Sequence, residues 1–162
     1  HHPRENPKMS RSKLTGLVRL PFASLLLALT ACAGMQMNSE VVATDNAPKA
    51  IGPYSQAIRS GPMLFLAGQI PIDPKTNQLV VGTIEEETTL VLNNLKAVLE
   101  ANGMTMANVV STSVFMKDLN DFPKMNTVYG TYFQKAPPAR ATVQVARLPR
   151  DVKVEISAIA VK

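Results

Sequence analysis

The stretch PPARATVQVARLPRDVKVEI, residues 137–156, contains two charged side chains that could take part in chemistry. Arg140 lies among small residues in one β-patterned run, and Glu155 is a lone carboxylate in the next. Arg140 offers hydrogen-bond donors and a fixed positive charge, and Glu155 can accept a proton. Both could equally be ordinary surface charges, so the rest of the chain must decide between the two interpretations.

The rarest residue types restrict the available chemistry. Both histidines are His1 and His2, the single cysteine is Cys32, and from Gly34 onward the sequence contains no His, Cys or Trp. This excludes Ser-His-Asp and Cys-His catalysis, histidine bases, zinc sites with Cys or His ligands, and disulfides from that part. Any chemistry there must use carboxylates, hydroxyls, Lys or Arg side chains, or backbone groups.

The formal net charge of +5 is unevenly distributed. Residues 1–36 contain five Lys or Arg and one Glu, whereas residues 37–162 contain twelve Lys or Arg and eleven Asp or Glu. The second part therefore has little excess positive potential to attract a phosphate backbone. Nucleic-acid binding is a weak hypothesis for it.

The N-terminal part has the features of an export signal. Three basic residues precede the apolar run 20–29, which is the length of a signal core and too short to span a bilayer. The following LTAC resembles the bacterial lipoprotein box, in which Cys32 would be lipidated after cleavage, although ACA also fits ordinary signal cleavage. If this leader is used, we expect the periplasm or cell envelope.

The alternative is that translation starts at Met35 or Met37 and leaves a cytoplasmic domain. The residues before Met9 look like a tag remnant or upstream translation and are excluded from fold reasoning. We therefore divide the chain into a leader over residues 1–36 and one domain over residues 37–162.

Hydrophobic periodicity predicts the elements of that domain. Residues 41–44 are a short strand candidate, and two further β-like runs that meet near Ser60-Gly61-Pro62 predict a hairpin. Residues 83–103 are the clearest helix, with a Thr83–Glu86 capping box and Gly103 as its stop. Its apolar stripe consists of Ile84, Val91, Leu92, Leu95, Val98 and Leu99.

The remaining sequence predicts a strand over 108–119, a helix over 120–134 and two C-terminal strands. The second helix is expected to begin near Asn120 or Asp121, with Pro123 in its first turn. Strands before, between and after two helices predict a single α+β domain, in which a mixed sheet carries both helices on one face.

Alternation in the two last strands places Arg140 and Glu155 on a common face if these strands pair as a hairpin about Pro149-Arg150. They would then lie about 13 Å apart, too far for a direct ion pair within one chain. Ile159 and Val161 share the face of Glu155. A partner subunit covering that face is one interpretation, and a half-exposed sheet with scattered charges is the other.

Five segments resemble, in order and spacing, the Rid (YjgF-type) family of reactive intermediate deaminases, most closely its RidA subgroup of 2-iminobutanoate/2-iminopropanoate deaminases. They are NAPKAIGPYSQAI, AGQIPIDPKT, VFMKDLNDFPKMN, PPARATVQVARLP and VKVEISAIAV. The resemblance covers residues 38–162 and implies a chorismate-mutase-like α+β fold. It also implies a homotrimer with active sites in clefts between subunits, where Arg140 and Glu155 need not come from one chain.

The implied reaction is hydrolysis of enamines and imines such as 2-aminoacrylate to 2-oxo acids and ammonia, without a cofactor or metal. By resemblance, Arg140 would hold the substrate carboxylate through two parallel charge-assisted hydrogen bonds. Glu155 would position and deprotonate the attacking water and pass a proton to the departing nitrogen. No nucleic-acid partner is expected, and a membrane contact only through a lipid at Cys32.

Four further positions match the family pattern less directly. Tyr54 corresponds to the family's site tyrosine, although it could also be a core aromatic, and Gly68 would allow close backbone approach to the ligand or serve a bulge. Ala67 stands where the family usually has a serine, and Thr142 where a cysteine is often found. By resemblance, the backbone of Thr142 would still contact the substrate carboxylate. The absent serine hydroxyl leaves rate and substrate preference open.

Two other functions compete with the enzyme. One is a trimeric small-ligand or regulatory protein that kept the cleft and lost turnover, which Ala67 favours and the pair Arg140 and Glu155 disfavours. The other is action on RNA or unfolded proteins, activities attributed to some relatives. The near-neutral domain gives the second little support.

Overall fold

A computed structural model describes residues 38–162. The predicted leader, the lipidation of Cys32 and the alternative starts at Met35 and Met37 lie outside the described residues. Within the described part, no helix combines the length and apolarity needed to cross a membrane.

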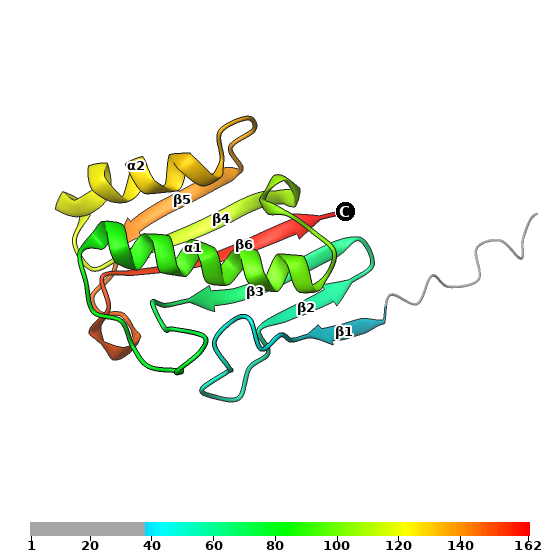
Figure 1. The fold of residues 1–162 in the computed structure, drawn as a ribbon. Coiled ribbons are helices and arrows are strands. Elements are labelled where there is room, and N and C mark those ends of the chain that lie inside the picture. The colour runs from blue at the N-terminus through cyan, green and yellow to red at the C-terminus, as the bar shows by residue number, and fades with distance from the viewer. Residues whose placement is uncertain (1–37) are drawn as a thin grey trace, which may run out of the picture. The chain divides into compact units, whose positions relative to one another are not determined.

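One six-stranded sheet carries two helices on a single face (Figure 1). The strand order is β1-β2-β3-β6-β4-β5, and every neighbouring pair is antiparallel except β4 and β5. The predicted α+β class with a mixed sheet is confirmed. The elements are β1 (Ser39–Val42), β2 (Ala57–Ser60), β3 (Met63–Gln69), α1 (Ile84–Ala101), β4 (Val109–Met116), α2 (Phe122–Tyr132), β5 (Ala139–Gln144) and β6 (Val154–Val161).

Helix α1 begins and ends where the sequence predicts. The Thr83 side chain accepts from the Glu86 amide, and the Glu86 carboxylate accepts from the Thr83 amide at 2.7 Å. Gly103, which follows the last turn, has φ of +66°, a conformation that glycine adopts without a steric penalty. All six residues of the predicted apolar stripe are buried against the sheet.

Helix α2 begins one residue after Asp121, in agreement with the prediction, and has a proline in its first turn. The Asp121 side chain makes no capping hydrogen bond. Instead, a short 3-10 turn over Leu119–Asp121 leads into the helix, and the Asp118 side chain accepts from the Asn120 amide at 2.8 Å.

The predicted pairing of the last two strands is wrong. Strand β4 lies between β5 and β6, and Phe115 pairs with Val143 on one side and Glu155 on the other. The turn at Pro149–Asp151 therefore carries the chain past β4 instead of closing a hairpin. A hairpin would have set Gln144 opposite Glu155, and this one-residue difference in register exchanges the two faces of the sheet.

The two faces of the sheet differ sharply in burial. The face toward the helices forms the core, in which Leu64, Val114 and Ile156 are fully buried. On the opposite face Phe65 and Val143 are 42% and 44% exposed. Exposed aromatic and branched side chains on one face of a sheet form an apolar surface that is available to a partner.

Candidate active site

A pocket of about 280 Å³ brings together four of the residues predicted for the site: Tyr54, Ala67, Gly68 and Glu155. They come from the loop before β2, from β3 and from β6. Its other lining residues are Ile51, Ile70 and Pro149. These three apolar residues lie in segments that resemble the family, but the sequence did not predict them as site residues.

A β-bulge positions the β3 side of the pocket. Leu66 pairs with Ala158 and Gln69 with Ile156, so β3 uses three steps where β6 uses two. Ala67 and Gly68 are the intervening residues, and the Ala67 amide donates to the Gln56 carbonyl at 3.0 Å. The extra residue lets the backbone of β3 approach the side chain of Glu155.

Gly68 is required here by this close approach. A Cβ atom added to Gly68 would collide with the Glu155 carboxylate and lie 3.1 Å from its Cγ atom. The bulge predicted as one reason for this glycine is therefore present, and the close approach that the structure shows is to the Glu155 side chain of the pocket. Contact with a ligand stays a prediction.

Glu155 is partly buried, which is uncommon for a carboxylate side chain. Desolvation by burial raises the pKa of its carboxyl above the ordinary value of 4.5. Among residues 38–162 no hydrogen bond or ion pair of this carboxylate is present. A carboxylate with a raised pKa and no partner is a stronger base than an exposed one and can exchange a proton with water or a ligand.

Tyr54 lies in the loop before β2, so the alternative of a core aromatic in a β-run is wrong. It is 47% exposed and forms part of the pocket wall. Its hydroxyl accepts from the Ile51 amide at 3.2 Å, which ties the loop together and leaves the hydroxyl proton free to donate.

Arg140 lies outside this pocket, on the face of the sheet that the helices cover. Its guanidinium lies over the Tyr129 ring, with Cζ 4.5 Å from the ring centroid, and its Nη2 atom donates to Asn126 Oδ1 at 2.9 Å. No ion pair of Arg140 is present within residues 38–162, so further donors of its guanidinium are available to an anion. Burial raises the pKa of Tyr129, while a hydrogen bond with Thr112 and the charge of Arg140 oppose this increase.

Thr142 lies two residues further along the same edge strand. The side-chain oxygen of Thr142 is buried and has no hydrogen-bond partner in the described part of the chain. The outer backbone edge of β5 has no neighbouring strand in the sheet. Thr142 therefore belongs to the region around Arg140 and not to the pocket around Glu155.

The predicted common face for Arg140 and Glu155 is wrong. Arg140 shares its register position with the buried Thr112, whereas Glu155 shares its position with Phe115, which points to the other face. One chain thus presents two separate groups, the pocket residues around Glu155 and the edge-strand residues around Arg140.

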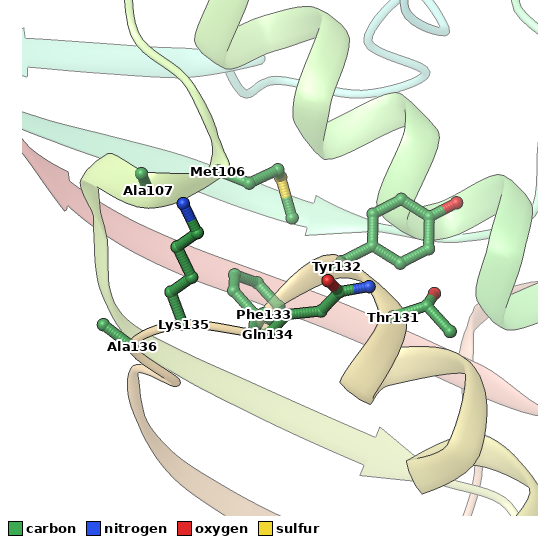
Figure 2. Close-up of a pocket in the computed structure, with 8 residues that line it drawn as sticks. All are labelled: Met106, Ala107, Thr131, Tyr132, Phe133, Gln134, Lys135 and Ala136. Carbon is green, nitrogen blue, oxygen red and sulfur yellow. The ribbon is translucent and has the colours of Figure 1, made fainter.

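Another pocket of about 320 Å³ lies between the end of α2 and the 3-10 turn over Met106–Asn108. Figure 2 shows the Lys135 side chain extending toward Ala107, while the Met106 and Tyr132 side chains lie to the right of Lys135 in this view. This pocket contains one cationic side chain and no carboxylate. Lys135 and the Tyr132 hydroxyl can exchange protons, but the pocket offers no carboxylate base like Glu155. No cluster of three or more His, Cys, Asp or Glu side chains that could hold a metal ion exists within residues 38–162.

The sheet and helices agree with comparisons to known proteins. The family model described as Endoribonuclease L-PSP matches residues 44–162. A RutC family protein from Pyrococcus horikoshii is 58% identical over 123 residues, which cover 76% of this chain and 98% of that protein. The 2-iminobutanoate/2-iminopropanoate deaminase of Salmonella typhimurium is 48% identical over 127 residues, covering 76% of this chain and 98% of the deaminase.

A solved structure gives the same result. The crystal structure of E. coli TdcF with bound serine matches with a TM-score of 0.73 and 44% identity, over 76% of this chain and 98% of that chain. The fold and the sequence therefore define a small α+β domain shared by many proteins. The chain belongs to the YjgF/Rid family, which confirms the resemblance of its five segments.

Proposed function

We propose that the protein hydrolyses reactive imine and enamine carboxylates, such as 2-iminopropanoate and 2-iminobutanoate, to 2-oxo acids and ammonia. The observation that carries this proposal is the partly buried Glu155, which has no ion-pair or hydrogen-bond partner within residues 38–162, beside Tyr54 in a pocket of about 280 Å³. The deaminase from Salmonella, at 48% identity, supports the same reaction class.

Both groups of residues have a place in this reaction. The guanidinium of Arg140 binds the substrate carboxylate in its own plane and thereby orients C2. Water adds to C2 of the imine while Glu155 takes one of its protons, so that a C–O bond forms and the C=N double bond becomes single. Glu155 then returns the proton to nitrogen, which gives a carbinolamine. Glu155 next takes the hydroxyl proton of the carbinolamine and passes it to nitrogen, so that the C=O bond forms as the C–N bond breaks and ammonia leaves with a 2-oxo acid as the other product. The Tyr54 hydroxyl donates a hydrogen bond to the ligand or to the water.

A homotrimer would bring the two groups together. Within one chain Arg140 and Glu155 lie on opposite faces of the sheet, so a complete site requires Arg140 from a neighbouring copy. The exposed Phe65 and Val143 on the open face supply apolar surface for such an assembly. Three equivalent sites would then form between adjacent subunits.

Ala67 supports a second candidate function, that of a small-ligand sensor. It lines the pocket where a serine hydroxyl would otherwise be available. A protein with the same cleft and slow turnover would act as a small-ligand sensor, and the serine held in the E. coli TdcF structure shows that a relative binds a small amino acid. The name Endoribonuclease L-PSP suggests RNA as a further substrate, which the near-zero charge of residues 37–162 supports little.

The deciding experiment uses residues 37–162, which correspond to nearly the whole length of the matched relatives. 2-Aminoacrylate is generated enzymatically, and pyruvate release is followed with wild type, with Arg140→Ala and without protein. We expect acceleration by wild type that is lost in the variant. A folded trimer that gives no acceleration but binds 2-oxobutanoate would favour the sensor.

Localisation depends on the leader. We propose that Cys32 becomes the lipidated N-terminus of an envelope protein, on the order of positive segment, apolar run and LTAC box. Intact-mass analysis of the protein from its native host tests this. An unmodified polypeptide that begins at Met35 or Met37 would contradict it.

A further inference from the structure

Arg140 rests on a platform provided by helix α2. Its Cζ atom lies 4.5 Å from the centroid of the Tyr129 ring and 5.6 Å from that of Phe122, and Asn126 accepts a hydrogen bond from it at 2.9 Å. An arginine side chain on an edge strand would otherwise sample many rotamers. The helix therefore restricts a cation that has no ion-pair partner among residues 38–162.

The contacts restrict different motions of the guanidinium. The contact over the Tyr129 ring restricts the position of the guanidinium, and the hydrogen bond to Asn126 restricts its rotation. The N–H groups that do not face Asn126 remain in the plane where a carboxylate binds through two parallel hydrogen bonds. The platform thus orients Arg140 without using all of its donors.

Tyr129 is itself held in place from two sides. It is 4% exposed, its ring packs against Phe133 with centroids 4.6 Å apart, and its hydroxyl shares a 2.7 Å hydrogen bond with Thr112 Oγ1. Thr112 is the residue of β4 that pairs with Arg140 on β5. Thr112, Tyr129 and Arg140 therefore form a chain of contacts that links the sheet, the helix and the cation.

We propose that Tyr129, held by Thr112, is the positioning residue that orients the Arg140 guanidinium for the carboxylate of the ligand. This inference rests on the proposed function in assigning the ligand to Arg140. Tyr129 does not touch the substrate and acts through Arg140. The competing explanation is that Tyr129 only fills the core beside α2, in which case its loss would affect stability and not carboxylate affinity.

Matched variants separate these explanations. Tyr129→Phe keeps the ring and loses the hydrogen bond, Tyr129→Leu removes the ring, and Thr112→Val removes the other partner of the hydrogen bond. Tyr132→Phe is the control, because the Tyr132 hydroxyl bonds to Asn93 and the Thr89 carbonyl, in contacts that do not involve Arg140. Each variant is assayed for KM and kcat with the imine and for Kd with 2-oxobutanoate, the unreactive product.

We expect Tyr129→Leu to raise KM and the Kd of 2-oxobutanoate about tenfold, as loss of a partly desolvated cation–π contact implies. Tyr129→Phe and Thr112→Val should raise both about two- to threefold, with a smaller change in kcat, and Tyr132→Phe should change neither. In an Arg140→Ala background Tyr129→Leu should cause little further loss of affinity. An equal loss in that background, or unchanged affinity in Tyr129→Leu, would overturn the inference.

Nuclear magnetic resonance of the Arg140 Nε–H group gives a readout that does not depend on turnover. In the free wild-type protein this resonance should be shifted by the ring and ordered, and in Tyr129→Leu it should move toward the position of a free arginine. If wild type shows no deamination while the resonance and the oxo-acid affinity depend on Tyr129, the proposed function fails and this inference stands. If wild type deaminates and neither quantity depends on Tyr129, this inference alone fails.

Discussion

Gly68 of β3 and Glu155 of β6 approach each other so closely that a methyl group on Gly68 would overlap the Glu155 carboxylate. The bulge between Leu66 and Gln69 creates this approach, and the backbone conformation of Gly68 is not left-handed. The glycine is therefore needed for the position of a side chain and not for a turn.

Gly68→Ala should reduce activity much more than stability. The added Cβ displaces the end of a flexible side chain, so the fold tolerates it while the carboxylate leaves its place. We expect kcat/KM to fall at least about tenfold, since a general base that is displaced by 1 Å loses much of its effect. Thermal unfolding measures the stability of the variant. Gly130→Ala is the control, because its added Cβ would meet nothing within 4 Å. A large stability loss with intact activity in the remaining folded protein would contradict this explanation.

The raised pKa of Glu155 predicts two pH effects. Because burial raises the pKa above 4.5, the acid limb of kcat/KM should lie above that value if Glu155 acts as the base. A limb at or below 4.5, or one that persists unchanged in Glu155→Gln, would contradict the assignment.

The same shift predicts how stability depends on pH. The folded state binds the Glu155 proton more tightly than the unfolded state, so its contribution to stability falls as pH rises from the unfolded pKa through the folded one. Glu155→Gln should therefore be at least as stable as wild type at neutral pH. That advantage should disappear below the unfolded pKa, and urea unfolding at several pH values measures it.

Ala67→Ser tests the most visible departure of the pocket from the family pattern. The serine would place a hydroxyl beside Glu155 in a partly buried pocket. We expect kcat/KM to rise about two- to tenfold, as one added hydrogen bond to a ligand or water implies. Ala67→Gly serves as the control for a change in size alone. An unchanged rate would mean that the hydroxyl has no part in turnover here.

Much of this architecture follows from local sequence patterns. The capping box at Thr83, the stop at Gly103 and the proline near the start of α2 depend on neighbouring residues, and the structure has each of them. The pairing of β5 with β4 joins residues about 28 positions apart in the sequence, such as Ser111 and Ala139. No local pattern encodes this pairing. The error in the faces of Arg140 and Glu155 follows directly from that pairing.

The buried acid Glu87 shows a second limit of sequence patterns. It follows Glu85 and Glu86 in the first turn of α1. Acids in a first turn are expected to be exposed and to interact favourably with the helix dipole. Glu87 is instead 2% exposed and accepts from the Lys153 amide at 2.8 Å and the Lys153 Nζ atom at 3.3 Å. This contact fixes the start of β6, two residues before Glu155, and only the tertiary structure reveals it.

Glu87→Ala should lower the free energy of unfolding by about 2–4 kcal/mol, because it leaves a partly buried backbone amide and a partly buried ammonium without a partner. Glu87→Gln keeps an acceptor for the Lys153 amide and should cost less. Glu85→Ala, in the same turn, is the matched control and should change stability by about 0.5 kcal/mol or less. Equal effects of Glu87→Ala and Glu85→Ala in urea unfolding would show that the buried contact adds no stability.

The separation of Arg140 and Glu155 onto opposite faces leads to a test that needs no structure of the assembly. If each site takes Glu155 from one subunit and Arg140 from another, two inactive variants should restore activity when they share a trimer. Arg140→Ala and Glu155→Gln chains, unfolded and refolded together in equal amounts, should regain about a quarter of the wild-type activity, the share of interfaces that pair both native residues. Each variant refolded alone is the control. No recovery in mixed trimers verified by mass would place the complete site within a single chain, and the two groups would then require a rearrangement of β5 that this structure does not contain.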